Sequence, residues 1–162
     1  LDARTGTSLP LVQCDASRLP FADASFDVVF SAFGAVPFIA DTSALMRELA
    51  RVTRPGGLVA FSTTHPVRWS LPDVPDAAGL TIQHSYFDTT PYAEAAGDDV
   101  VYVEHHRTLE QRVRELLDAG LVLEQLRELP WKESNESTWG GWSPLRGRLV
   151  PGTLILAGRR PA

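Results

Sequence analysis

Apolar and polar residues follow one another in blocks along this chain, and the blocks predict a succession of strands and helices. Runs that are apolar at nearly every position are typical of strands buried on both faces of a sheet. Such runs occupy residues 11–14, 28–33, 58–61 and 153–157, and a fifth strand is expected at 121–129. The runs therefore predict one central sheet.

Two further segments carry apolar residues at helical spacing. The first begins after Asp41, a favourable N-cap, where Leu45 and Leu49 share an apolar stripe and the charged residues face away. The second begins after Thr108, which forms a capping box with Gln111. Strands that alternate with helices favour an α/β fold, and the last two strands, with no helix between them, should be antiparallel.

Two long segments break this alternation. Residues 66–104 are rich in Pro, Asp, Gly and aromatic residues, and within them only 81–87 alternates like a strand. Residues 130–151 form a loop rich in Trp, Ser and Gly. We therefore expect a single domain over residues 1–162 with an insertion at about 66–104 and a long loop at about 130–151, and loops of this length are usually functional.

Composition narrows the class of partner. The formal net charge is −5 and no basic cluster is present, which argues against nucleic acid. No apolar stretch reaches the length of a membrane span. The single cysteine, Cys14, cannot form an internal disulfide, which fits a cytoplasmic protein. A small molecule is the expected partner, and the frequent Ala, Arg and Gly are typical of a bacterial gene rich in GC.

Three segments, at residues 12–21, 25–31 and 49–61, resemble consecutive motifs of the class I S-adenosylmethionine-dependent methyltransferases. The resemblance implies a Rossmann-like sheet, mostly parallel with a final antiparallel strand. It implies methyl transfer from S-adenosylmethionine to a small-molecule acceptor.

In that family two strands and a glycine-rich cofactor loop come before the strand that matches residues 11–14. We therefore expect a partial domain that lacks the first two strands and is inactive by itself. Unpaired strand edges would let it self-associate.

The resemblance also assigns residues to the cofactor site. These are Asp15, Ala16, Leu19, Ser31, Ala32 and Phe33. A carboxylate at Asp15 can accept a hydrogen bond from the adenine amino group, and a small neighbour lets the backbone approach the ring. The alternative role for Asp15 is that of a turn residue at the end of a strand.

Methyl transfer is an in-line displacement that requires alignment of the two reactants and, for some acceptors, a base. The candidate bases are His65 and His106, with His84 and His105 as alternatives. The histidines and carboxylates lack the spacing of a metal site. Five aromatic residues in the two long segments either anchor the loops or line an acceptor pocket: Trp69, Tyr86, Trp131, Trp139 and Trp142.

Two other functions fit parts of the pattern. A nicotinamide-dependent oxidoreductase also has a doubly wound sheet, but the antiparallel final pair and the segment around Asp15 argue against it. A non-enzymatic remnant that binds a partner through a methyltransferase-like surface is the second alternative. The sequence of the complete gene would distinguish a remnant from part of an enzyme.

Overall fold

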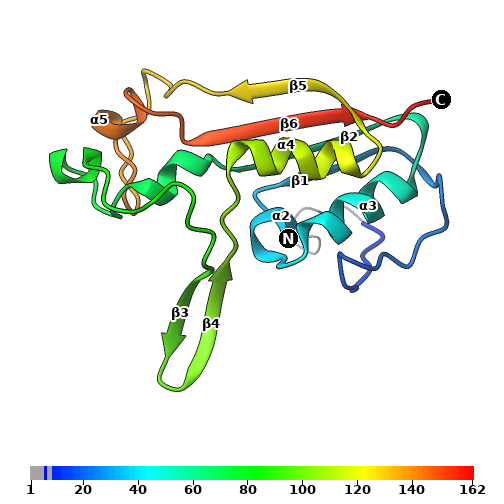
Figure 1. Cartoon of the computed structure of the whole chain (residues 1–162), viewed down its shortest axis with the longest axis horizontal. Helices are drawn as coiled ribbons and strands as arrows, with labels where there is room; N and C mark the ends of the chain where they lie inside the picture. Colours follow the sequence, from blue (N-terminus) through cyan, green and yellow to red (C-terminus); the bar gives the residue numbers. More distant parts are fainter. Residues whose placement is uncertain (1–5, 7–8) are drawn as a thin grey trace.

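A computed structural model describes residue 6 and residues 9–162. Its centre is a four-stranded sheet in the order β1-β2-β6-β5 (Figure 1). The strands are β1 (Phe26–Ala32), β2 (Thr53–Thr64), β5 (Val122–Glu128) and β6 (Thr153–Arg159). β1 is parallel to β2, and β6 is antiparallel to both of its neighbours. The mostly parallel sheet and its antiparallel last strand are therefore confirmed.

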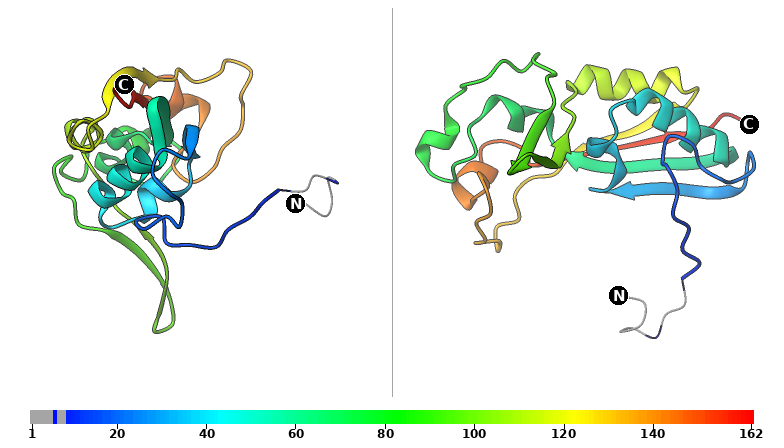
Figure 2. Two further views of the ribbon diagram at one scale, coloured as in Figure 1. Left: turned by 90° about the vertical axis from the view of Figure 1, so that its right-hand side faces the viewer. Right: turned by 90° about the horizontal axis from the view of Figure 1, so that it is seen from below.

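Two helices, α3 (Thr42–Val52) and α4 (Leu109–Asp118), cover one face of the sheet (Figures 1 and 2). The short α2 (Ala35–Phe38) follows β1. The core between helices and sheet is apolar and fully buried, and includes Leu45, Met46, Leu49, Val59, Phe61, Leu116, Leu154 and Leu156. Each such side chain contributes about 1.5–3 kcal/mol on burial, so this layer provides most of the stability.

The capping residues predicted from the sequence form the expected hydrogen bonds at the starts of α3 and α4. The Asp41 carboxylate accepts a hydrogen bond from the Ala44 amide at 2.8 Å, and Thr108 and Gln111 form the expected capping box. At the other end of α3, Arg160 donates from Nη1 to the carbonyl oxygens of Ala50, Arg51 and Thr53. A cation at a helix C-terminus is favoured by the helix dipole, so the chain terminus is fastened to α3.

Two predicted strands do not form. Residues 11–14 have no strand structure and run away from the body of the protein (Figure 2). They lie apart from the sheet, and a strand needs a neighbour for its backbone groups. Residues 81–87 are also irregular, and the insertion instead forms its hairpin from β3 (Tyr92–Ala96) and β4 (Asp99–Glu104).

The insertion and the long loop add the remaining elements. Two 3₁₀ helices, η1 (Pro66–Ser70) and η2 (Ala77–Leu80), precede the hairpin, which projects from the body (Figure 1). The loop between β5 and β6 contains α5 (Pro144–Gly147). Residues 66–104 therefore stand beside the sheet and do not extend it.

The sheet has an uncovered apolar surface at β1. This strand is the edge of the sheet, and its side chains Val28 and Phe30 are 53% and 75% exposed. Val29 points to the opposite face and packs against the core. An unpaired edge with apolar side chains favours pairing with another chain.

We predict that Phe30→Lys reduces self-association of the chain without destabilising it, because a charge is added to an exposed site at the sheet edge. Sedimentation velocity over a range of concentrations measures the effect. Ile82→Lys is the matched control, since Ile82 is equally exposed at 75% but lies outside the sheet. If both variants associate as the wild type does, this surface is not the contact.

Candidate functional site

The carboxyl ends of the parallel strands meet at one edge of the sheet and border a cavity of about 390 Å³. Phe33 follows β1, Thr64 ends β2, Leu129 follows β5, and all three line this cavity. Ligands of open α/β sheets bind at this edge. Trp131, Trp139 and Trp142 complete the wall, so we call the space the tryptophan cavity.

The three tryptophans are held rigidly in the long loop. The rings of Trp131 and Trp139 are stacked, with centroids 5.2 Å apart and planes inclined by 18°. Trp139 and Trp142 exchange two backbone hydrogen bonds of 3.0 and 2.9 Å. Gly147 lies against the Trp131 ring, where a Cβ atom would collide with it. The wall of the cavity is thus preformed.

Arg146 packs against the Trp142 ring of this wall. Its side chain is fully buried, and its guanidinium carbon lies 4.8 Å from the centroid of the Trp142 ring. Nη1 donates to the carbonyl oxygens of Pro72 and Gly141, each at 2.9 Å. The Asp73 carboxylate accepts from the Gly141 amide at 2.6 Å. These contacts join the long loop to the insertion.

His65 lies at the end of β2, but both of its ring nitrogens are engaged. Nε2 is 2.8 Å from Oε1 of Glu128, and Nδ1 accepts from the Val67 amide at 3.2 Å. His65 thereby caps η1 and links the ends of β2 and β5. To act as a base it would have to give up one of these hydrogen bonds.

The other expected aromatic residues form a separate group in the insertion. Trp69 and His106 line a second cavity of about 330 Å³, together with His84. Tyr86 adjoins it, because its carbonyl oxygen is 2.8 Å from Nε2 of His106. In the described structure the two cavities share no lining residue. We call the second space the insertion cavity.

The cofactor candidates occupy two places. Asp15 is exposed, and its Oδ1 accepts from the Ser17 amide at 2.8 Å and from the Ser17 hydroxyl at 2.7 Å, which lowers the pKa of the carboxyl group. These hydrogen bonds form a turn, which is the alternative role expected for Asp15. The turn leaves Oδ2 for a further donor, so the two roles are compatible. Ala16 and Leu19 are partly buried against the core.

Ser31, Ala32 and Phe33 lie at the carboxyl end of β1. The Ser31 hydroxyl accepts from the Ala35 amide at 3.2 Å, and the Phe33 amide donates to the Ser62 carbonyl at 3.1 Å. Phe33 has a φ of 50°, in the left-handed region, and is half-exposed. A bulky residue rarely adopts this φ, so the backbone is strained where the strand opens toward the tryptophan cavity.

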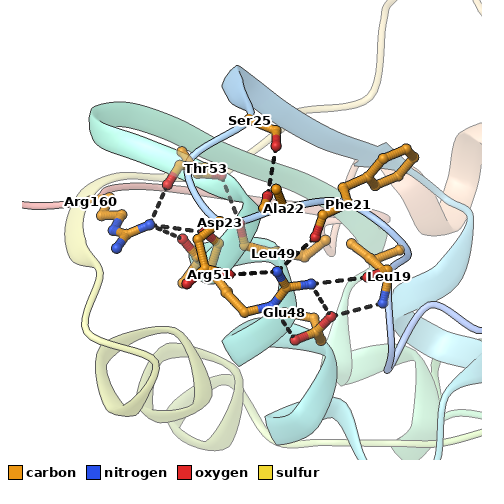
Figure 3. A network of polar contacts seen from close by, with 11 residues as sticks. Leu19, Phe21, Ala22, Asp23, Ser25, Glu48, Leu49, Arg51, Thr53 and Arg160 are labelled. Atoms are coloured by element: carbon orange, nitrogen blue, oxygen red, sulfur yellow. Dashed lines mark hydrogen bonds and ion pairs between the residues drawn. The ribbon is translucent and has the colours of Figure 1, made fainter.

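A charged network fastens the segment around Leu19 to α3 (Figure 3). The Glu48 carboxylate accepts from the Leu19 amide at 2.8 Å and from two nitrogens of Arg51 at 2.7 and 2.8 Å. Arg51 also donates to the carbonyl oxygens of Phe21 and Leu19 and pairs with Asp23. The Arg51 hydrogen bonds lower the pKa of Glu48 to about 2. The sequence shows Glu48 and Arg51 three residues apart, a spacing typical of an ion pair, but not their contacts with residues 19–23.

The sequence and the fold of this chain are similar to those of known methyltransferases. Residues 2–61 match the methyltransferase domain family. The demethylmenaquinone methyltransferase of Mycobacterium marinum is 56% identical over 152 residues, which cover 91% of this chain and 56% of that protein. A putative S-adenosylmethionine-dependent methyltransferase from Listeria monocytogenes superposes with a TM-score of 0.76 at 18% identity, over 99% of this chain and 75% of that one.

A methyltransferase of the same kind from Mesorhizobium loti superposes with a TM-score of 0.64 at 24% identity, over 91% of this chain and 68% of that one. The architecture is thus that of a Rossmann-like methyltransferase. Over residues 2–61 the chain is similar to the methyltransferase domain family, and its fold is that of the S-adenosylmethionine-dependent methyltransferases. It spans 28–59% of the length of the curated relatives compared.

The described residues contain neither a membrane-spanning helix nor a metal-binding group. None of their helices has the length and apolar character needed to cross a membrane. Within the same residues, histidine, cysteine and carboxylate side chains do not gather into a group that could hold a metal ion.

We predict that Glu48→Gln lowers the free energy of unfolding by about 1–3 kcal/mol at pH 7, because it weakens hydrogen bonds to a charged group. The folded pKa of Glu48 is about 2 and the ordinary value is 4.5. Its stabilisation is therefore complete above pH 4.5 and is lost as the pH falls toward 2.

Denaturant unfolding at pH 7 and pH 3 tests this prediction, and the difference between wild type and variant should narrow at pH 3. Glu110→Gln is the control, since Glu110 forms an exposed pair with Arg114 and should cost less than about 1 kcal/mol. Equal effects of the two substitutions would show that the network around Glu48 adds nothing.

Proposed function

We propose that the protein transfers a methyl group from S-adenosylmethionine to a planar small molecule bound in the tryptophan cavity. The observation that carries the proposal is the position of Phe33. It directly follows the strand whose carboxyl terminus faces the cofactor in the methyltransferases that the chain resembles, and it lines the tryptophan cavity. Donor and acceptor would therefore meet at this residue.

The residues near β1 are chemically suited to the cofactor. Asp15 offers an exposed carboxylate with one oxygen left to accept from the adenine amino group. Leu19 packs against the core and is only partly buried, and we propose that its remaining surface contacts the ring. Ser31 and Ala32 are small enough to leave room beside the strand end. The bound cofactor supplies an activated methyl group on a sulfonium, and the protein's task is to align the acceptor with it.

Aromatic walls favour an aromatic acceptor. A flat ring can stack on Trp139 or Trp131, and such aromatic contacts add about 0.5–1.5 kcal/mol each beyond the burial of area. The Mycobacterium marinum relative is a demethylmenaquinone methyltransferase. We therefore propose a quinone-type acceptor, as its reduced quinol.

The tryptophan cavity also contains polar groups that could orient the acceptor. Lys132, Asn135 and Thr64 line it. We propose that alignment provides most of the rate acceleration, since His65 is engaged with Glu128 and Val67. The negative charge of the chain supports action on small molecules and not on nucleic acid, and the single cysteine supports a cytoplasmic protein.

The acceptor assignment is tested with Trp139→Leu in the polypeptide that the gene encodes. With demethylmenaquinol as acceptor and S-adenosylhomocysteine release as readout, we expect KM for the acceptor to rise about tenfold, because a stacking surface is lost. KM for S-adenosylmethionine should stay unchanged. Trp69→Leu, in the insertion cavity, is the control and should alter neither constant. A change confined to the cofactor constant would contradict the placement.

The cofactor assignment is tested with Asp15→Ala. Calorimetry should show that S-adenosylmethionine binds several-fold more weakly, since the adenine amino group loses its acceptor. Asp23→Ala is the comparison, because Asp23 lies in the same segment and pairs with Arg51 instead. Unchanged affinity in Asp15→Ala would leave the turn as the role of this residue.

A further inference from the structure

The insertion cavity has no part in the proposed methyl transfer, yet it has the properties of a binding site. It encloses about 330 Å³ between the 3₁₀ helix η1, the irregular segment after η2 and the start of the hairpin. Its lining includes two aromatic rings, Trp69 and Tyr92, and two imidazoles, His84 and His106.

His106 provides an unused hydrogen-bond acceptor. Its side chain lines the cavity and is only 2% exposed. Nε2 lies 2.8 Å from the Tyr86 carbonyl oxygen, and because a carbonyl can only accept, Nε2 carries the proton. Burial lowers the pKa of His106, which keeps the ring neutral. Nδ1 is then a lone-pair acceptor, and among the described residues it is buried without a partner.

The aromatic rings define the shape of a ligand. The Trp69 ring lies 5.8 Å from the His106 ring and 5.9 Å from the Tyr92 ring, measured between centroids. A flat ring can pack against such a wall with offset stacking. Tyr92 begins the projecting hairpin and is 43% exposed, so one side of this aromatic wall faces solvent. A ligand reaches the shielded Nδ1 only when the side chains that cover it shift.

The charges around the cavity disfavour an anion. The one guanidinium of the lining, Arg68, pairs with Asp73 at 3.2 Å and lies over Trp69 at 4.9 Å from the ring centroid. The Asp88 carboxylate also lines the cavity and accepts from the Thr90 amide at 3.0 Å. One paired cation against two carboxylates leaves a slightly negative surface, which repels an anionic ligand.

We propose that the insertion cavity is a second binding site, for a neutral planar aromatic molecule whose hydroxyl group donates a hydrogen bond to Nδ1 of His106. Such a ligand satisfies the buried acceptor and fills the space beside Trp69. The proposal does not depend on the methyl transfer proposed above, because the two cavities are lined by different residues.

The experiment compares 2-naphthol with 2-methoxynaphthalene by calorimetry on this chain. The two probes have similar rings, but only 2-naphthol can donate. We expect 2-naphthol to bind about fivefold more tightly, the effect of one hydrogen bond to a buried acceptor. His106→Gln should abolish this preference, since glutamine can keep the donor to Tyr86 but has no atom in place of Nδ1.

His84→Gln is the matched control, because His84 lines the same cavity and is exposed. It should keep the preference. Nitrogen NMR of the wild-type imidazoles gives a readout free of any folding defect, and 2-naphthol should shift Nδ1 of His106. Equal affinity for the two probes, or an unmoved Nδ1 resonance, would overturn the proposal.

Discussion

The parallel pairing of β1 with β2 is the constraint on which the arrangement of the site depends. The register runs from Val28 opposite Leu58 to Ala32 opposite Ser62, so both strands arrive together at one edge of the sheet. Parallel strands need a crossover, and α3 supplies it while burying its apolar stripe. The chain therefore has to leave the sheet at this edge after each strand. Phe33 and Thr64 become neighbours around one cavity as a consequence.

Two long segments leave the sheet at this edge, and a buried cation joins them. Arg146 donates to carbonyl oxygens of both segments, but in the described structure its Nε and Nη2 have no partner. Burial lowers the pKa of Arg146 and is costly, although the nearby Asp73 carboxylate opposes this effect. The stacking on Trp142 and the two carbonyl contacts offset part of this cost. The guanidinium of Arg146 contacts Pro72 in the insertion cavity and Trp142 in the tryptophan cavity. It therefore joins the walls of the two cavities, although they share no lining residue.

The sequence predicted the elements whose causes are local. Periodicity and capping residues define α3 and α4, and continuous apolar runs define β1, β2 and β6. The failed prediction at residues 11–14 shows the limit of this reasoning, since an apolar run becomes a strand only beside a partner. The pattern at 81–87 failed because backbone contacts to η1 took precedence, with the Gln83 amide bound to the Ser70 carbonyl.

The sequence predicted aromatic residues of the candidate cavities, but not which of them lie together. All five aromatic residues lie in the two long segments, yet nothing local reveals that Trp69 and Trp139 belong to different cavities. The sequence also did not reveal that Glu48 and Arg51 bind residues 19–23 to α3. These contacts join positions about 30 residues apart. Loop contacts of this kind depend on the complete fold.

The uncovered edge of the sheet and the proposed cofactor site involve the same region of the chain. Asp15 lies in the segment that leads to β1, and Phe33 directly follows that strand. A partner that pairs with β1 would adjoin the start of the strand, where this segment enters it. A ligand that needs the segment ordered would bind more tightly once that cost of ordering has been met. On the proposed role of Asp15, a partner at the edge of β1 would therefore favour cofactor binding through this one strand.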